Sequence, residues 1–192
     1  MTRKSPSRRA DKKPADREPL VFSDKQSEYT LGQLERDIPI GLAAEAADAV
    51  ITLTEQARRV VQILTRELDP EVYHSQRFAD ALSFLARRSP TSEVQILIQD
   101  SRPAIAGNHV LIPLCQQLTS YVKIRRVNDE YLLTPDEFLI ADKIGFMYRK
   151  SYQHYDGLVN FCSPAKAKRL DEAFNEIWNV SSADPEFRLL HI

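Results

Sequence analysis

The sequence predicts an α/β domain in which helices cover both faces of a mixed β-sheet. Segments with apolar residues at helical spacing alternate along the chain with short runs rich in valine, isoleucine and leucine. That alternation is the order of a layered α/β domain. The clearest run, residues 93–99, carries Val94, Ile96, Leu97 and Ile98, as in a strand buried on both faces.

The helices are predicted from apolar periodicity and from their end signals. Residues 42–57 are alanine-rich and carry an apolar stripe at spacings of three and four. Residues 75–88 place phenylalanine and leucine on one face and arginines on the other, and Pro90 ends the segment. A third helix is expected at residues 107–118, and a fourth at 164–179, after Ser163 as N-cap with Pro164 at the first helical position.

The strands are predicted from short apolar runs bounded by turn residues. They are expected at residues 59–68, 93–99, 121–127, 138–141, 144–148 and 158–162. Residues 121–127 alternate apolar and basic side chains, which indicates a half-exposed or edge strand. Residues 138–141 and 144–148 flank Asp142, Lys143 and Gly145 and are expected to pair as a buried hairpin.

The chain divides into a tail, residues 1–27, and one domain, residues 28–192. Residues 1–19 of the tail contain three prolines and seven basic residues and few apolar residues, so we expect the tail to be disordered. It either solubilises the protein or binds phosphate groups as a basic arm. The domain is long enough to bury a core without disulfides or a structural metal.

Composition narrows the classes of function and location. The net charge is −1, which argues against nucleic acid as a general partner of the whole protein. No apolar run approaches the ~18 residues of a membrane span, and no apolar segment follows the N-terminal charges, so neither a membrane partner nor a secretory signal is expected. Cys115 and Cys162 form no Cys-x-x-Cys pair, which indicates free buried thiols in the cytoplasm and no zinc site.

Two groups of polar residues are candidates for binding. Asp100 and Arg102 follow the strand at residues 93–99, and ligands of open α/β sheets bind beyond the carboxyl ends of strands. The full candidate ligand set is Asp100, Arg102, Asp136, Glu137 and Asp142. Asp100 could instead cap a turn while Arg102 pairs with a carboxylate. The spacing of these carboxylates matches no calcium loop, and no metal or cofactor is expected.

The second group is basic and lies on the expected edge strand. Lys123, Arg125 and Arg126 could contact the phosphates of a nucleic acid, or could protect the strand against aggregation. The loop that carries Tyr152, His154 and Tyr155 could stack a base or cover the sheet.

The order of elements and the hairpin Phe138-Leu139-Ile140-Ala141-Asp142 resemble one repeat of the phospholipase D-like superfamily. The hairpin of that family carries His-x-Lys-x-x-x-x-Asp. Asp142 matches the aspartate, but Glu137 stands at the lysine position and Pro135 at the histidine position. The resemblance therefore implies the fold without its nucleophile, so no catalytic residue is assigned. Since single-repeat members pair two copies, it also implies a homodimer.

Residues 45–192 also resemble an uncharacterised bacterial domain family of pseudomonads, which is sometimes fused to GNAT-type acetyltransferases. The segments Gln99–Pro103 and Asp136–Asp142 carry this resemblance, together with Trp178-x-x-Ser181 and the residues that follow. No acetyl-CoA loop is present in this sequence, so an acetyltransferase activity would belong to another chain.

Three functions remain open at this point. The first is a non-catalytic domain that binds a ligand or a protein partner. The second is a metal-assisted hydrolase or phosphodiesterase with relocated carboxylates, and the third is a nucleic-acid-binding accessory protein that uses the basic tail. The missing His-x-Lys pair favours the first.

Overall fold

The computed structural model describes residues 18–25, 27–184 and 187. The expected disorder of residues 1–17 therefore lies outside the described residues. None of the described helices is long and apolar enough to cross a membrane.

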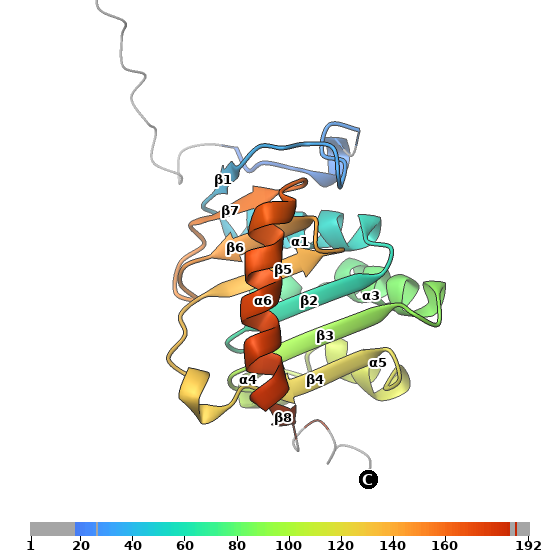
Figure 1. The fold of residues 1–192 in the computed structure, drawn as a ribbon, viewed down its shortest axis with the longest axis vertical. Coiled ribbons are helices and arrows are strands. Elements are labelled where there is room, and N and C mark those ends of the chain that lie inside the picture. The colour runs from blue at the N-terminus through green and yellow to red at the C-terminus, as the bar shows by residue number, and fades with distance from the viewer. Residues whose placement is uncertain (1–17, 26, 185–186, 188–192) are drawn as a thin grey trace, which may run out of the picture.

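A mixed sheet of eight strands forms the centre of the described part of the chain (Figure 1). In their order across the sheet, the strands are β1 (Ile38–Ile40), β7 (Gly157–Asn160), β6 (Gly145–Arg149), β5 (Glu137–Ala141), β2 (Val60–Thr65), β3 (Glu93–Ile98), β4 (Val122–Arg126) and β8 (Ser182–Ala183). β2, β3 and β4 are parallel, and the other pairings are antiparallel. The carboxyl ends of three neighbouring strands consequently lie at one edge of the sheet.

Helices cover both faces of this sheet, as predicted. In Figure 1, α6 (Pro164–Val180) crosses the front of the sheet, and α1 (Ala43–Gln56), α3 (Gln76–Arg88) and α5 (Leu111–Gln117) lie behind it. The short helices α2 (Pro70–Tyr73) and α4 (Arg102–Ala106) follow β2 and β3. The α/β class with a mixed sheet between helices is thus confirmed.

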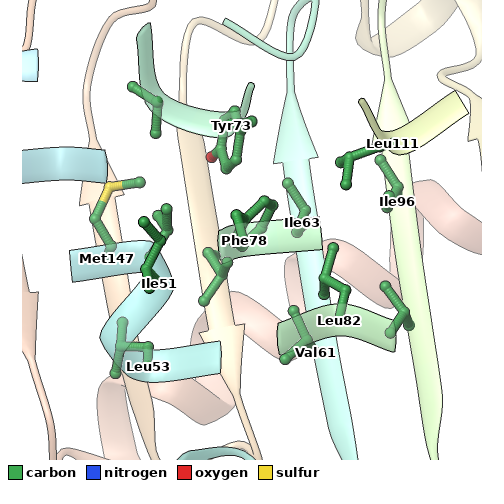
Figure 2. Packing of buried hydrophobic residues seen from close by; sticks show 14 of the residues in the cluster. Ile51, Leu53, Val61, Ile63, Tyr73, Phe78, Leu82, Ile96, Leu111 and Met147 are labelled. Atoms are coloured by element: carbon green, nitrogen blue, oxygen red, sulfur yellow. The ribbon is translucent and has the colours of Figure 1, made fainter. Parts of the chain in front are cut away.

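Each face of the sheet has its own hydrophobic core. Behind the sheet, Phe78 and Leu82 of α3 pack with Ile63 of β2 and Ile96 of β3 (Figure 2). In front of it, Phe174 of α6 and its neighbours pack on inward side chains of β2, β3 and β5. Burial on both faces explains why these strands are apolar at nearly every position.

The predicted hairpin is present as β5 and β6. Asp142 and Lys143 have φ angles of 51° and 58°, and the Ile144 N–H donates to the carbonyl of Ala141 at 3.0 Å. Two successive residues in the left-handed region are the conformation of a type I′ turn, which suits the twist of paired strands.

The helix predicted at residues 107–118 is wrong in its boundaries. Only α5 stands within that range, because α4 ends at Ala106 and the two short helices are separated by a turn in which Asn108 has a φ of 48°. The N–H groups of Gly107 and His109 donate to Pro103 and Ala104 and so end α4. Apolar periodicity continues through this turn, and it therefore did not reveal the break.

The N-terminal boundary of the domain also differs from the expected one at residue 28. Phe22 is fully buried, with its ring 5.0 Å from that of Tyr29 and 5.8 Å from that of Phe161. The carboxylate of Asp48 accepts hydrogen bonds from the backbone of Phe22 and Ser23. A single buried aromatic side chain thus attaches a polar segment to the domain, and composition alone does not detect such an anchor.

Candidate functional site

A cavity of about 350 Å³ opens where the carboxyl ends of the parallel strands meet. Arg66 follows β2, Gln99–Arg102 follow β3, and Arg126 is the last residue of β4. Leu132, from the loop between β4 and β5, completes the lining and is its one apolar residue. Ligands of open α/β sheets bind at this kind of edge.

Asp100 and Arg102 form a two-point ion pair at the rim of the cavity. The backbone N–H and Nε of Arg102 donate to Asp100 Oδ1 at 3.1 and 2.8 Å, and Nη2 donates to Oδ2 at 2.6 Å. The hydrogen bonds from Arg102 lower the pKa of Asp100 to about 2 against the opposing effect of burial, and the charge of Arg126 adds to the lowering. Asp100 is therefore ionised at neutral pH.

The other two arginines of the cavity have no carboxylate partner among the described residues. Arg126 is exposed, and Arg66 is half-buried. The guanidinium carbon of Arg66 lies 4.2 Å from the ring centroid of Tyr152, in the loop between β6 and β7. With three guanidinium groups and one carboxylate, the lining has a net charge of +2.

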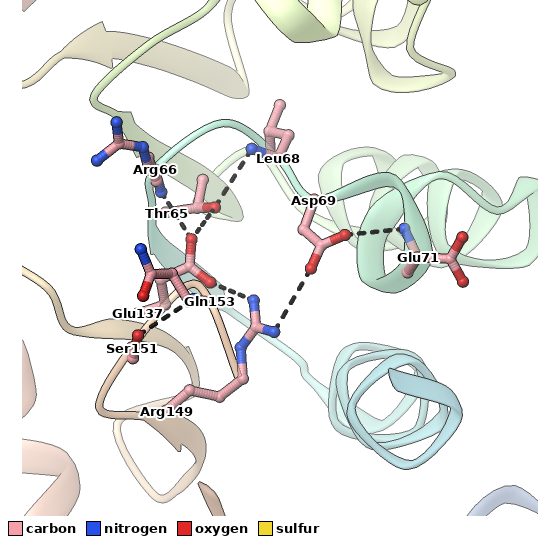
Figure 3. Close-up of polar contacts among 9 residues, drawn as sticks. All are labelled: Thr65, Arg66, Leu68, Asp69, Glu71, Glu137, Arg149, Ser151 and Gln153. Carbon is pink, nitrogen blue, oxygen red and sulfur yellow. Dashed lines mark hydrogen bonds and ion pairs between the residues drawn. The ribbon is translucent and has the colours of Figure 1, made fainter. Parts of the chain in front are cut away.

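A second polar cluster lies beside this cavity and is sealed from solvent (Figure 3). Glu137 is 1 % exposed and Arg149 is 0 % exposed. Glu137 Oε1 accepts from Thr65 Oγ1 at 2.9 Å and from the backbone N–H of Arg66 at 2.7 Å, while Oε2 accepts from Arg149 Nη2. Arg149 Nη1 also reaches Asp69 at 3.5 Å.

Strand register explains the central pair of this cluster, because Glu137 and Arg149 are directly opposite in the β5–β6 ladder. Burial opposes the charge of Arg149, but Glu137, Tyr73 and Asp69 raise its pKa above the ordinary value. Tyr73 is buried next to the pair, and burial raises the pKa of its hydroxyl. Glu137 and Arg149 thus form a buried ion pair in which each charge compensates the other.

Asp136 and Asp142 lie at opposite ends of β5, so the five predicted ligand residues do not form one cluster. Asp136 Oδ1 accepts from the hydroxyl of Tyr148 at 2.9 Å. Burial and this hydrogen bond raise the pKa of Tyr148 to about 12. Asp142 accepts the backbone N–H groups of Arg58, Arg59 and Val60 at 2.7 to 3.0 Å. Of the predicted five, only Asp100 and Arg102 line the cavity.

The predicted phosphate-contacting residues of β4 have three different environments. Lys123 Nζ donates to Glu93 at 2.7 Å. Arg125 donates to the carbonyl of Trp178 at 2.6 Å, and its guanidinium lies 4.4 Å from the Trp178 ring centroid. Arg126 lines the cavity. The expected edge strand is in fact bordered by the two-residue β8, which pairs with Arg125 and Arg126.

Arg66 is the cavity residue that the sequence analysis missed. It directly follows β2 in the structure, but the strand predicted at residues 59–68 included it, so the rule that selected Asp100 did not select Arg66. Its contact with Tyr152 had no signal, because 86 residues separate the two positions along the chain.

No group of three or more histidine, cysteine, aspartate or glutamate side chains within residues 18–25, 27–184 and 187 could hold a metal ion. The carboxylates expected to gather near the strand ends are instead separated, each with its own hydrogen-bond donors.

Comparisons with solved structures show the same fold. The archaeal chromatin protein TrmBL2, whose structure "shows a novel mode of DNA binding", superposes with a TM-score of 0.59 at 13 % identity. That match covers 84 % of this chain and 59 % of the TrmBL2 chain, so this chain spans under two thirds of that relative.

Two phospholipase D-type structures match over almost their whole length. Nuc from Salmonella typhimurium, a phospholipase D family member, has a TM-score of 0.54 at 14 % identity, with 78 % of this chain and 99 % of Nuc covered. NucT from Helicobacter pylori has a TM-score of 0.55 at 12 % identity, with the same coverage. The fold is therefore phospholipase D-like.

No curated protein matches this sequence. A family profile described as "Domain of unknown function (DUF7931)" matches residues 42–190, which is most of the chain. This range includes all the strands except β1 and all six α-helices described above. The chain belongs to this family, DUF7931.

Proposed function

We propose that this chain is a non-catalytic ligand-binding domain that binds a small anion in the arginine-lined cavity. The observation that carries the proposal is the net charge of +2 on a lining in which Arg66 and Arg126 have no carboxylate partner among the described residues. A planar guanidinium presents several N–H donors in one plane, which suits phosphate and carboxylate groups.

The proposed absence of catalysis is supported by positions 135 and 137. Proline offers no nucleophile at the histidine position of the superfamily motif. Glutamate at the lysine position accepts hydrogen bonds from Thr65, Arg66 and Arg149, and its negative charge would repel a phosphate. A substrate phosphate would have to displace the buried ion pair of Glu137 and Arg149 to occupy this place.

The metal-assisted hydrolase is supported less well. That function requires Asp100, Asp136, Glu137 and Asp142 to converge, and they lie in separate surroundings. Nucleic-acid binding is also supported less well, because two of the three strand residues expected to contact phosphates have partners within the chain. Lys123 donates to Glu93, and Arg125 donates to the carbonyl of Trp178. The likeness to TrmBL2 concerns the fold.

Two further expectations accompany the proposal. Cys115 and Cys162 are buried free cysteines, which supports the cytoplasm as the location, because reducing compartments keep such thiols reduced. A homodimer remains the assembly implied by the superfamily, and sedimentation velocity on the full chain would test it.

Isothermal titration calorimetry with inorganic phosphate, pyrophosphate and sulfate tests the proposal. Arg66→Ala and Arg126→Ala should each weaken binding by about 1.5 kcal/mol, roughly tenfold, because each removes charged hydrogen bonds. Affinity should also fall as the sodium chloride concentration rises.

Arg87→Ala is the matched control. Arg87 is exposed at the end of α3, at the opposite edge of the sheet from the cavity. This variant should bind all three anions like the wild type. Absence of binding by all three anions, or equal losses in the three variants, would overturn the proposal.

A further inference from the structure

The side chain of Arg66 contacts an aromatic ring and also lines the cavity. Its guanidinium carbon is 4.2 Å from the centroid of the Tyr152 ring. Arg66 lines the cavity, whereas Tyr152 does not. The Tyr152 ring thus helps to hold a guanidinium group that belongs to the lining of the cavity.

A guanidinium held in this way has one face left for a ligand. The group is planar, and its N–H donors point outward in the plane, so its two faces are free to stack on aromatic rings. The guanidinium carbon of Arg66 lies over the Tyr152 ring, so Tyr152 occupies one face, and the opposite face would be the one open to a ligand in the cavity that Arg66 lines. A planar aromatic group of a ligand can stack there, which completes a layer of ring, cation and ring.

The rest of the lining restricts the class of ligand further. Leu132 is the one apolar residue among those that line the cavity, so an acyl chain would find little apolar surface there. The volume of about 350 Å³ lies at the small end of ordinary ligand pockets, which range from about 300 to 1,000 Å³. Arg126 and Arg102, beyond Arg66, provide the positive charge for a dianion.

We infer that the ligand is a free nucleoside monophosphate, with its base stacked on the face of Arg66 and its phosphate bound by Arg126, Arg102 and the in-plane N–H groups of Arg66. This inference rests on the proposed function, because it assigns a chemical class to the anion that the cavity binds. The contribution of the base is separate from that of the phosphate, and each can be removed by choice of probe.

The test compares adenosine 5′-monophosphate with ribose 5-phosphate by isothermal titration calorimetry. The two share the phosphate and the sugar, so their difference reports the base. Stacking of a base on an aromatic side chain contributes about 1–3 kcal/mol, and with a similar contribution from Arg66 adenosine 5′-monophosphate should bind at least about fivefold more tightly than ribose 5-phosphate.

Substitutions of Tyr152 and Arg66 test whether this pair causes the preference for adenosine 5′-monophosphate over ribose 5-phosphate. Tyr152→Leu should remove most of this preference. The affinity of this variant for ribose 5-phosphate should stay within about twofold of the wild-type value, because the charges of the cavity remain. Arg66→Lys should also remove the preference, because lysine keeps the charge but has no planar face. Tyr155→Leu is the matched control: Tyr155 lies in the same loop but faces Arg149, with 5.1 Å between the ring centroid and the guanidinium carbon. It should retain the preference.

Each outcome has a distinct meaning. Equal affinities of wild type for the two probes would overturn this inference and leave the anion-binding function standing. Failure of both probes and of inorganic phosphate to bind would refute the proposed function as well. A 5′-phosphorylated pentadeoxyadenylate that binds more than about tenfold tighter than the mononucleotide would also overturn the inference, because the ligand would then be the end of a strand.

Discussion

Replacement of Arg149 by methionine tests the account of the buried cluster most directly. Arg149 is 0 % exposed and donates to Glu137 and Asp69. Methionine fills a similar volume without charge, so the main change is the loss of the positive group. Glu137, which is 1 % exposed, keeps the hydrogen bonds from Thr65 Oγ1 and the Arg66 N–H but loses its ionic partner.

An unpaired charge left in a protein interior destabilises the fold by about 3–5 kcal/mol. In a domain of this size, each kcal/mol lowers the melting temperature by about 2–4 °C. We therefore expect Arg149→Met to lower the free energy of unfolding by about 4 kcal/mol and the melting temperature by roughly 10 °C.

Urea unfolding monitored by circular dichroism measures this change, and Arg77→Met is its control. Arg77 donates two hydrogen bonds to Glu55, at 2.7 and 2.9 Å, but 48 % of its side chain is exposed. An exposed pair of this kind contributes less than about 1 kcal/mol. The double variant Glu137→Leu with Arg149→Met should be more stable than Arg149→Met alone, because both buried charges are then removed.

A loss of under about 1 kcal/mol in Arg149→Met would refute this reasoning. So would a double variant less stable than the single one, since Glu137 would then stabilise the fold independently of Arg149.

Three other predictions concern single side chains. Asp142→Ala should lower the free energy of unfolding in urea by about 3 kcal/mol, because the N–H groups of Arg58, Arg59 and Val60 lose their acceptor. Asp142→Asn should lower it less, and equal losses in the two variants would contradict this account. The pKa of Asp100 is lowered to about 2 in the folded state, so its ion pair should stabilise the wild type over Asp100→Asn by about 1 kcal/mol above pH 5. Thermal unfolding should show that this difference in stability disappears as the pH falls from about 4 to 2. Burial raises the pKa of Cys115 to about 12, so Cys115 in the native protein should react with a disulfide reagent at least about a hundredfold more slowly than in the urea-unfolded chain. Equal rates in the two states would show that the Cys115 thiol is accessible in the native protein.

The phospholipase D-like fold places different chemistry at neighbouring positions of the same sheet edge. At the amino end of β5, where the superfamily motif would begin, the chain carries Pro135 and the buried Glu137. At the carboxyl ends of β2, β3 and β4 it carries an open, positively charged cavity. Because folds host many unrelated sites, the proposed anion binding depends on the arginines and not on the fold.

Local patterns determined much of the architecture. The apolar runs predicted β2, β3 and the β5–β6 hairpin, because a strand buried on both faces must be apolar along its length. The Ser163-Pro164 signal predicted the start of α6, because proline suits the first helical turn. The position of Asp100 and Arg102 after a strand was enough to place them at the edge of the sheet where the cavity opens.

Tertiary structure alone decided which polar groups meet. Glu137 faces Arg149 because of the hairpin register, and Asp142 binds backbone groups more than 80 residues earlier. Arg66 reaches Tyr152 only because the β6–β7 loop lies over the end of β2. Apolar periodicity depends on near neighbours in the chain, whereas these contacts depend on which strands are adjacent in the sheet. A carboxylate that binds a ligand and one that binds its own backbone therefore look the same in the sequence.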